Sequence, residues 1–207
     1  TAVLIRGAGV DITAFAPSPE PPPPVRIILI ARMIREKGIQ TFAEAARLLP
    51  GEAEFVLVGA IDPGNPNSAT EAELLGWQAE GLVTWLGPRQ DIAALLAGAH
   101  IACQPSSYRE GLPKSALEAA AAGKPLVTSD VPGCRETVVD GVTGFIVPPR
   151  NAPALAAALK KLIDDPDLRA RMGAAGRLRT EREFADEIIC EKTVLVYDAL
   201  SKPRSTR

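Results

Sequence analysis

The sequence predicts an α/β fold with a doubly wound, parallel sheet of about six strands, and two observations lead to this prediction. Six short apolar runs recur along the chain, each bounded by glycine or proline, as strands covered on both faces require. Segments with the length or composition of helices lie between these runs. Because strands that alternate with helices form right-handed βαβ units, we expect the runs to pair in parallel.

The predicted elements follow one another without long gaps. In chain order, the apolar runs occupy residues 25–30, 53–59, 82–87, 100–105, 124–129 and 144–149. The helical segments between them occupy residues 38–49, 69–80, 91–99, 113–123 and 133–139. After the last run, "DDPD" (164–167) indicates that one helix stops and another restarts. A final amphipathic run occupies residues 184–200.

The stretch "PSPEPPPP" (17–24) divides the chain, because it fits neither a helix nor a central strand. It predicts three parts: an N-terminal segment with a proline-rich linker (1–24), a main domain (25–183) and a C-terminal region (184–207). The sequence does not begin with methionine, which indicates a fragment or a processed form. It contains no run of ~20 apolar residues for crossing a bilayer, and its start does not resemble a signal peptide.

Composition argues against several classes of protein. With 23 basic and 25 acidic residues, the chain lacks the basic excess of nucleic-acid-binding domains, and only 4% of its residues are aromatic. Cys103, Cys134 and Cys190 show no CxxC spacing, so we expect reduced and mostly buried thiols in a cytoplasmic protein. His100 is the only histidine and is expected to be structural. We therefore predict no metal site.

Charged residues occur where the predicted sheet should bind a ligand, beyond the carboxyl ends of its strands. Lys37 and Gly38 stand at the start of the helix that follows the first strand. Pro113, at the expected first helical position, puts Lys114 in the first turn of a later helix. The dipole at a helix N-terminus disfavours a nearby lysine by a few tenths to ~1 kcal/mol. A bound phosphate would explain both lysines, together with Arg32 at the end of the first strand.

A second interpretation stays open, in which Glu36 and Glu110 neutralise the two lysines on a solvated surface. The chain has neither the G-x-G-x-x-G fingerprint of NAD-binding domains nor a P-loop sequence. The Asp-x-Asp within "DDPD" lies at a helix break, where it indicates a turn rather than a metal-bound nucleotide.

Two glutamates raise a separate question. Glu118 is the only charged residue from Ser115 to Gly123, in a helix expected to cover the sheet. A carboxylate costs free energy there unless a polar group meets it, and the paired hydroxyls of a ribose would do so. Glu110 lies in the preceding loop, on the approach to the same anion. The alternative is that Glu118 occupies an ordinary exposed helix position.

Several motifs together resemble one family. "EGLPKSALE" (110–118) resembles the E-x7-E signature of retaining glycosyltransferases of family four, which have the GT-B fold. "GAGVDITAFAP" (7–17), "ARMIREKGIQTF" (31–42) and "EAAAAGKPLVTSDVPGCRETVVDGVTGFIVPP" (118–149) resemble further motifs of that family, in the family's order. A GT-B fold pairs two Rossmann-like domains across a cleft. The resemblance implies that this chain is the C-terminal, donor-binding half, whose run at 184–200 crosses to a missing N-terminal domain.

The resemblance also implies roles for the charged residues. Arg32 and Lys37 would hold the diphosphate of a nucleotide sugar and help its departure. Lys114 and Ser115 would add backbone N–H groups to the same diphosphate, and Glu118 would bind the ribose hydroxyls. The nucleotide sugar is the donor substrate, with UDP expected before GDP as its nucleotide, and no cofactor or metal is implied.

The remaining candidates would surround the transferred sugar and the base. Glu110, with the backbone of Gly111 and Leu112, would hold the sugar's hydroxyls. Arg89, in the loop 87–91, would contact the base. Pro113 departs from the family pattern, in which glycine is frequent, and removes an N–H that would otherwise touch the sugar. The identity of the sugar therefore stays open.

The implied reaction transfers a hexosyl group to an acceptor hydroxyl with retention, in bacterial surface polysaccharide or glycolipid synthesis. The isolated chain is expected to bind donor and to be inactive, because the acceptor residues belong to the missing half. Membrane contact, if there is any, would also occur through that half, at the inner face of the membrane. Two alternatives remain: a transferase of the glycogen or sucrose synthase type, and a non-catalytic nucleotide-sugar-binding module.

Overall fold

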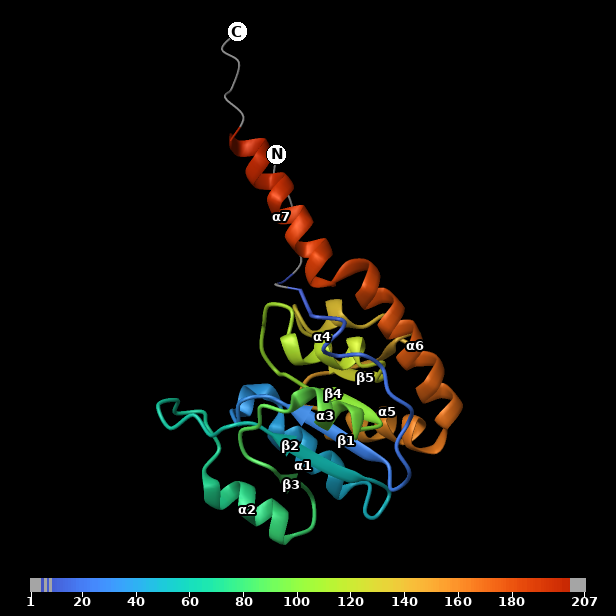
Figure 1. The fold of residues 1–207 in the computed structure, drawn as a ribbon. Helices are drawn as coiled ribbons and strands as arrows, with labels where there is room; N and C mark the ends of the chain where they lie inside the picture. Colours follow the sequence, from blue (N-terminus) through green and yellow to red (C-terminus); the bar gives the residue numbers. More distant parts are fainter. Residues whose placement is uncertain (1–4, 6, 8, 202–207) are drawn as a thin grey trace.

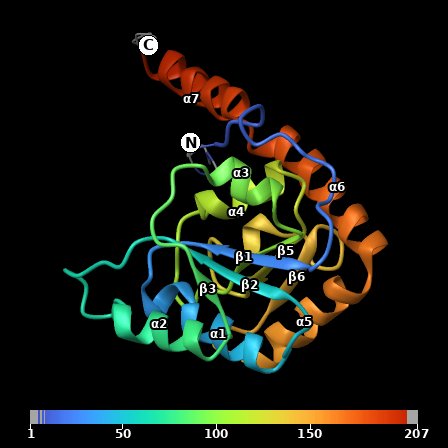
Figure 2. The same cartoon turned by 60° about the horizontal axis from the view of Figure 1, so that its bottom comes forward.

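The computed structural model describes residues 5, 7 and 9–201, which form a six-stranded sheet between two layers of helices (Figures 1 and 2). The strands stand in the order β3-β2-β1-β4-β5-β6, and every neighbouring pair is parallel. Each strand lies within one of the six predicted runs, so the predicted α/β fold is confirmed. The strands are β1 (Arg26–Ile30), β2 (Glu54–Val58), β3 (Thr84–Trp85), β4 (Ile101–Gln104), β5 (Leu126–Ser129) and β6 (Gly144–Val147).

Helices cover both faces of the sheet, as Figure 2 shows. In that view α3 and α4 lie over one face, and α1 and α5 lie over the other. The helices are α1 (Ile39–Arg47), α2 (Glu71–Ala79), α3 (Ile92–Ala97), α4 (Lys114–Ala121), α5 (Ala152–Asp164), α6 (Pro166–Glu183) and α7 (Asp186–Ser201), with short 3-10 helices η1 (Arg35–Lys37) and η2 (Arg135–Thr137).

The core is split by the sheet into two clusters. Ile27 and Leu29 of β1 pack into the cluster that includes side chains of α1 and α5. Ile28, between them in sequence, packs into the cluster that includes side chains of α3 and α4. Successive residues of a strand face opposite sides of its sheet, so a strand covered on both faces must be apolar throughout. Each fully buried Leu or Ile stabilises the fold by roughly 1.5–3 kcal/mol. Strands buried on both faces are therefore apolar along their whole length, and these apolar runs predicted where the strands lie.

The strand order places a switch point between β1 and β4. From β1 the chain moves outward through β2 to β3, then returns to the other side of β1 to form β4. The loops after β1 and after β4 therefore diverge to opposite faces, which opens a crevice at the carboxyl ends of these two strands. The charged loops singled out in the sequence are the loops at this crevice.

Three local predictions need correction. The segment 133–139 is not an α-helix but the single turn η2, because Gly133 before it has a φ of 92° and Val138 after it is extended. The run 82–87 contributes only two residues to the sheet, because β3 is an edge strand that pairs with β2 alone. Pro113 is the N-cap of α4 rather than its first helical residue, with an extended ψ of 122°.

The segments before and after the main domain meet each other. The N–H of Val10 donates to the Phe184 carbonyl at 2.9 Å, and the N–H of Asp186 donates to the Val10 carbonyl at 3.1 Å. Nη1 of Arg177 binds the carbonyl oxygens of Ile12 and Phe15, which fastens the N-terminal segment to α6. The predicted three-part division of the chain remains a prediction, and its residues 1–4, 6, 8 and 202–207 lie outside the described residues.

Helix α7 projects beyond the sheet and its covering helices, as Figure 1 shows. Its large apolar side chains are exposed along the outer half: Val194, Leu195, Tyr197 and Leu200. Within residues 5, 7 and 9–201, no helix combines the length and the apolar character that a bilayer crossing requires.

His100 and the cysteines have the environments expected of structural residues. The N–H of Arg26 donates to Nδ1 of His100 at 3.0 Å, and Nε2 of His100 lies 3.0 Å from the Pro21 carbonyl. Burial lowers the pKa of His100, which keeps the ring neutral in this role. All three cysteines are free, with Cys103 and Cys134 buried and Cys190 exposed.

Candidate functional site

Two loops meet at the switch point, and a glycine allows their approach. Gly38 forms the N-cap of α1 with a φ of 75°, and a Cβ atom there would lie 2.0 Å from the Pro105 carbonyl oxygen. Only glycine fits this position without moving the backbone of the loop after β4. The N–H of Ser107 donates to the Glu36 carbonyl at 2.8 Å, which joins the same two loops.

Lys37 and Glu110 form a closed ion pair across this junction. Their side chains are only 15% and 7% exposed, and Nζ of Lys37 binds Oε2 of Glu110. Nζ also lies 5.4 Å from the centre of the Tyr108 ring, within the range of a cation–π contact. Sγ of Cys134 lies 3.8 Å from Oε1 of Glu110. Burial, and then the charge of Glu110, raise the pKa of the Cys134 thiol to about 11.

The Lys37–Glu110 ion pair tests the second interpretation drawn from the sequence, in which Glu36 and Glu110 neutralise the two lysines on a solvated surface. Glu110 does neutralise a lysine, but the lysine is Lys37 and the pair is largely removed from water. Glu36 binds neither lysine, because its Oε1 accepts a hydrogen bond from Nδ2 of Asn67. The part of the second interpretation in which Glu36 neutralises a lysine is therefore wrong.

The loop before η2 supports the backbone of Glu110. The N–H of Glu110 donates to the Pro132 carbonyl at 3.0 Å. A Cβ atom on Gly133 would lie 2.3 Å from the Gly111 carbonyl oxygen, so only glycine allows this approach. Reasoning from the sequence did not single out Pro132 or Gly133 as site residues, although the "PG" pair was a visible sign of a tight turn.

Helix α4 points its N-terminus at the same crevice without a capping side chain. Pro113 at the N-cap has no side-chain acceptor to offer, and the first-turn N–H groups of Lys114 and Ser115 have no partner within the helix. Oγ of Ser115 donates to Oε1 of Gln104 at 3.0 Å, and Nε2 of Gln104 donates to Oγ of Ser106 at 2.9 Å. These bonds fix the first turn of α4 to the end of β4.

Lys114 and Glu118 form an open pair on that helix. Nζ of Lys114 lies 3.9 Å from Oε1 of Glu118, and the lysine side chain is 74% exposed whereas the glutamate side chain is only 12% exposed. Burial raises the pKa of Glu118, and the charge of Lys114 opposes that shift. The alternative of an ordinary exposed position for Glu118 is therefore wrong.

Two arginines complete the candidate set at the carboxyl edge. Nη1 of Arg32 binds Oδ2 of Asp62 at 2.7 Å, and the Arg32 side chain is 60% exposed. Arg89, which follows β3 at the far edge of the sheet, makes two bonds to the carboxylate of Asp91. The two arginines are thus held by separate carboxylates, and Arg89 lies at a strand two places from β1.

The crevice is suited to an anion that carries hydroxyl groups. Lys114, Arg32 and the uncapped N-terminus of α4 offer positive charge or free N–H groups. Glu118 offers a carboxylate that is buried and only weakly paired. Within the described part of the chain, no three His, Cys, Asp or Glu side chains gather in an arrangement that fits a metal ion.

Fold and site together define a Rossmann-like ligand-binding domain with its crevice at the topological switch point. The chain belongs to the family described as Glycosyl transferases group 1, which matches residues 11–179. It is 36% identical over 176 residues to N,N'-diacetylbacillosaminyl-diphospho-undecaprenol alpha-1,3-N-acetylgalactosaminyltransferase of Campylobacter jejuni, covering 85% of this chain and 45% of the relative. The chain thus spans about half the length of the relatives it matches.

Solved structures agree with the family. Sucrose-phosphate synthase of Thermosynechococcus elongatus superposes with a TM-score of 0.83 at 30% identity, covering 93% of this chain and 51% of that one. HepE of Anabaena, in complex with UDP, superposes with a TM-score of 0.83 at 23% identity, covering 92% of this chain and 56% of that one. The second likeness shows the fold alone. The expected GT-B family and its Rossmann-like domain are therefore confirmed.

Proposed function

We propose that this chain is the donor-binding half of a retaining glycosyltransferase of family four. It would take a hexosyl group from a nucleoside diphosphate sugar to an acceptor hydroxyl, in bacterial surface polysaccharide or glycolipid synthesis. The observation that carries the proposal is the uncapped N-terminus of α4 at the switch point, with Lys114 and the weakly paired Glu118 on the same helix. The Campylobacter relative, whose name includes a diphospho-undecaprenol carrier, supports the class of acceptor.

In this proposal the leaving diphosphate is stabilised by fixed positive charge. Arg32 and Lys37 contact its oxygens, and the N–H groups of Lys114 and Ser115 donate to it. Negative charge on the diphosphate grows as the bond to the sugar breaks, so groups already in place stabilise the transition state most. These groups would supply the charge stabilisation that a metal ion supplies in other transferases.

The other candidate residues recognise hydroxyl groups and the base. Glu118 accepts hydrogen bonds from the ribose, which relieves the cost of its burial. Glu110 and the backbone N–H groups of Gly111 and Leu112 hold the transferred sugar, and Pro113 offers no N–H at the next position. Arg89 lies by the base, which we take to be uracil first and guanine second.

The missing acceptor half explains two features of the chain. The chain spans about half of its relatives, and the apolar outer face of α7 has nothing to cover among the described residues. We therefore divide the protein at 1–24, 25–183 and 184–207 and assign α7 to a contact with an N-terminal domain. The isolated chain binds donor and transfers nothing. In the full-length protein, which we place in the cytoplasm, any contact with the membrane occurs through that domain.

A second candidate is a transferase of the sucrose or glycogen synthase type. The likeness to sucrose-phosphate synthase, at 30% identity over 93% of this chain, favours it. Both transferase candidates predict the same donor crevice and differ in the acceptor. The remaining alternative, a non-catalytic nucleotide-sugar-binding module, predicts a full-length protein that binds the donor and transfers no sugar.

Titration calorimetry with UDP and GDP tests the donor site. We expect one nucleotide to bind with a dissociation constant between the micromolar and the submillimolar range. Arg32→Ala combined with Lys37→Ala, and separately Glu118→Ala, should abolish or strongly weaken binding. Arg47→Ala is a matched control, because Arg47 pairs with Glu80 on the surface at the other end of α1. Binding of neither nucleotide by a folded chain, or transfer of sugar by the isolated chain, would contradict the proposal.

A further inference from the structure

One buried glutamine lies beneath the donor crevice, at the last position of β4. Gln104 is only 2% exposed, whereas the other residues of that strand (101–103) are apolar. A buried amide costs free energy unless its polar atoms are bonded, and an apolar side chain of similar size would fill the space without that cost. Packing alone therefore does not explain a glutamine at this position.

The Gln104 amide is bonded at both of its ends. Its Oε1 accepts a hydrogen bond from Oγ of Ser115 at 3.0 Å, and its Nε2 donates to Oγ of Ser106 at 2.9 Å. Oγ1 of Thr128, on the neighbouring strand β5, donates to the Gln104 carbonyl at 2.9 Å. Ser106 and Thr128 are fully buried. A buried polar network that is satisfied in this way makes the segments it joins rigid.

These bonds close the base of one loop. The loop 105–113 connects β4 to α4, and it carries Glu110. Ser106 stands near the start of this loop, and Ser115 stands in the first turn of the helix that follows it. The Gln104 side chain thus holds both ends of a loop that contributes to the proposed donor site.

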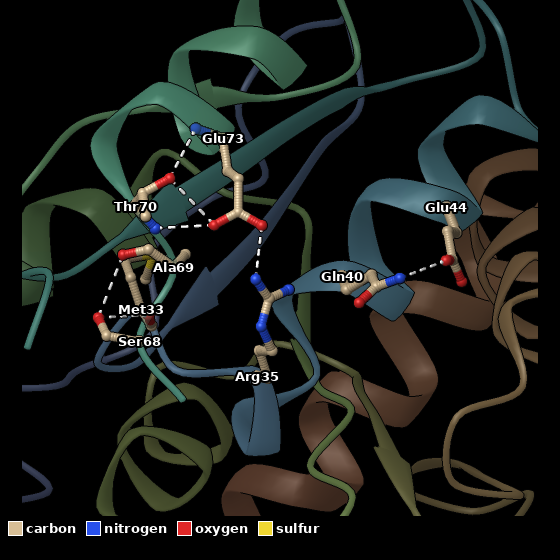
Figure 3. Close-up of polar contacts among 8 residues, drawn as sticks. All are labelled: Met33, Arg35, Gln40, Glu44, Ser68, Ala69, Thr70 and Glu73. Atoms are coloured by element: carbon tan, nitrogen blue, oxygen red, sulfur yellow. Dashed lines mark hydrogen bonds and ion pairs between the residues drawn. The ribbon is translucent and has the colours of Figure 1, made fainter. Parts of the chain in front are cut away.

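The N-terminus of α2 shows a different way of fixing a helix start (Figure 3). Oγ1 of Thr70 accepts a hydrogen bond from the N–H of Glu73, and the Glu73 carboxylate accepts one from the N–H of Thr70. The N-cap of α4 is Pro113, which makes no side-chain hydrogen bond to the helix. The start of α4 is held instead from beneath, through Ser115, and its first-turn N–H groups have no partner within the helix.

We propose that Gln104 is a positioning residue for donor binding, a role that rests on the proposed function. Its amide holds the loop that carries Glu110 and the first turn of α4 in fixed positions relative to each other. The groups assigned to the sugar and to the diphosphate then meet the donor together. Gln104 is itself too deeply buried to touch the donor. Groups that are in place before a ligand arrives lose little entropy when it binds.

Titration calorimetry with UDP and GDP measures this role. Gln104→Met, which removes both amide bonds and leaves a side chain of similar size, should weaken nucleotide binding by roughly tenfold. Ser115→Ala, which keeps the backbone N–H and removes one bond, should weaken binding by roughly fivefold. Because both variants break the same bond, the double variant should lose roughly tenfold, whereas independent effects would multiply to roughly fiftyfold.

Gln40→Met is the matched control, since the Gln40 amide donates to Oε1 of Glu44 at 3.0 Å on the exposed face of α1 (Figure 3). It should bind the nucleotide as the wild type does. Circular dichroism shows whether each variant is folded, because a merely structural role would change stability and leave the affinity of the folded chain unchanged. If Gln104→Met does not fold, Ser106→Ala and Ser115→Ala, which each cut one of the two bonds, take its place.

Three results would overturn the positioning role. Wild-type affinity in folded Gln104→Met, or in both single-bond variants, would do so and leave the proposed function in place. Losses that multiply in the double variant would do the same. Binding of neither nucleotide by the wild-type chain would overturn the proposed function, and the positioning role would fall with it.

Discussion

Two lysine–glutamate pairs lie at the carboxyl edge of the sheet, and they differ in almost every physical respect. Lys37 and Glu110 are 15% and 7% exposed and in direct contact, across 73 positions of sequence. Lys114 and Glu118 are four positions apart on α4, with the lysine 74% exposed and the atoms 3.9 Å apart. The first pair is closed by the meeting of two loops, and the second is left open on a helix.

The difference favours Glu118 over Glu110 as the carboxylate that would gain most from a bound ligand. In the closed pair, the Lys37 charge compensates for the burial of the Glu110 carboxylate when no donor is bound. In the open pair, the exposed lysine gives little compensation through water, and burial raises the pKa of Glu118. A buried carboxylate without a close partner costs free energy in the empty site. Hydrogen bonds from the hydroxyl groups of a bound ligand would offset that cost.

The largest expected effect comes from breaking the closed pair. Lys37→Met should lower the free energy of unfolding by roughly 3 kcal/mol, because it leaves the Glu110 carboxylate buried without its cation. Urea denaturation measures this change. The matched variant Lys114→Met should change stability by less than about 0.5 kcal/mol. Equal effects of the two variants would contradict the distinction between the pairs.

Glu118→Gln sharpens the comparison, because its effects on binding and on stability have opposite signs. UDP binding should weaken by roughly tenfold, since a charged hydrogen-bond acceptor for the ribose is lost. At neutral pH the variant should be more stable than the wild type, because the buried charge is removed. Calorimetry and thermal unfolding measure the two effects, and a variant that lost stability at neutral pH would contradict the account.

The pH dependence of stability tests the same account of Glu118 in a second way. The pKa of Glu118 is raised in the folded state, so its contribution to stability is present below the ordinary pKa of glutamate. That contribution is lost as pH rises through the raised value. The stability advantage of Glu118→Gln should therefore be absent in acid and grow across this range, which thermal unfolding at a series of pH values would show.

A smaller effect is expected at Arg32, where a third ion pair competes with the proposed diphosphate. Asp62 binds the guanidinium at 2.7 Å on the surface. Asp62→Asn should tighten UDP binding by up to about fivefold, since a surface ion pair of about 0.2–1 kcal/mol no longer has to be broken. Asp164→Asn, which removes a surface partner of Lys160 distant from the crevice, serves as the control in the same titration. Weaker binding in Asp62→Asn would show that Asp62 positions Arg32 rather than competing for it.

An effect of similar size, but with a different dependence on salt, is expected at Lys114. Lys114→Gln should weaken UDP binding by about twofold to fivefold, because one charge near the N-terminus of α4 is worth about 0.3–1 kcal/mol. The loss should shrink as salt is added, whereas the loss caused by Glu118→Gln should change little. Titrations at low and high salt compare the two, and an effect of Lys114→Gln that salt does not reduce would contradict the role of an exposed charge.

The sequence alone determined the strands and the charged loops of this protein. Apolar runs such as residues 25–30 predicted strands, because a strand between two layers of helices must be apolar on both faces. Gly38 and Lys37 were placed correctly at the start of α1, because helix ends have local signals. The roles of the site residues remain proposals.

Only the tertiary structure decided how those charges are partnered. Three features depend on the folded arrangement: Lys37 pairs with Glu110 rather than with Glu36, the Glu118 side chain is buried, and Arg32 pairs with Asp62. For a surface pair such as Arg32 and Asp62, the choice of partner is worth only a fraction of a kcal/mol, too little for a local sequence pattern to predict it. Apolar burial repeats along each strand and is visible in the chain, whereas the partners of a charge are set by which loops the strand order brings to one edge.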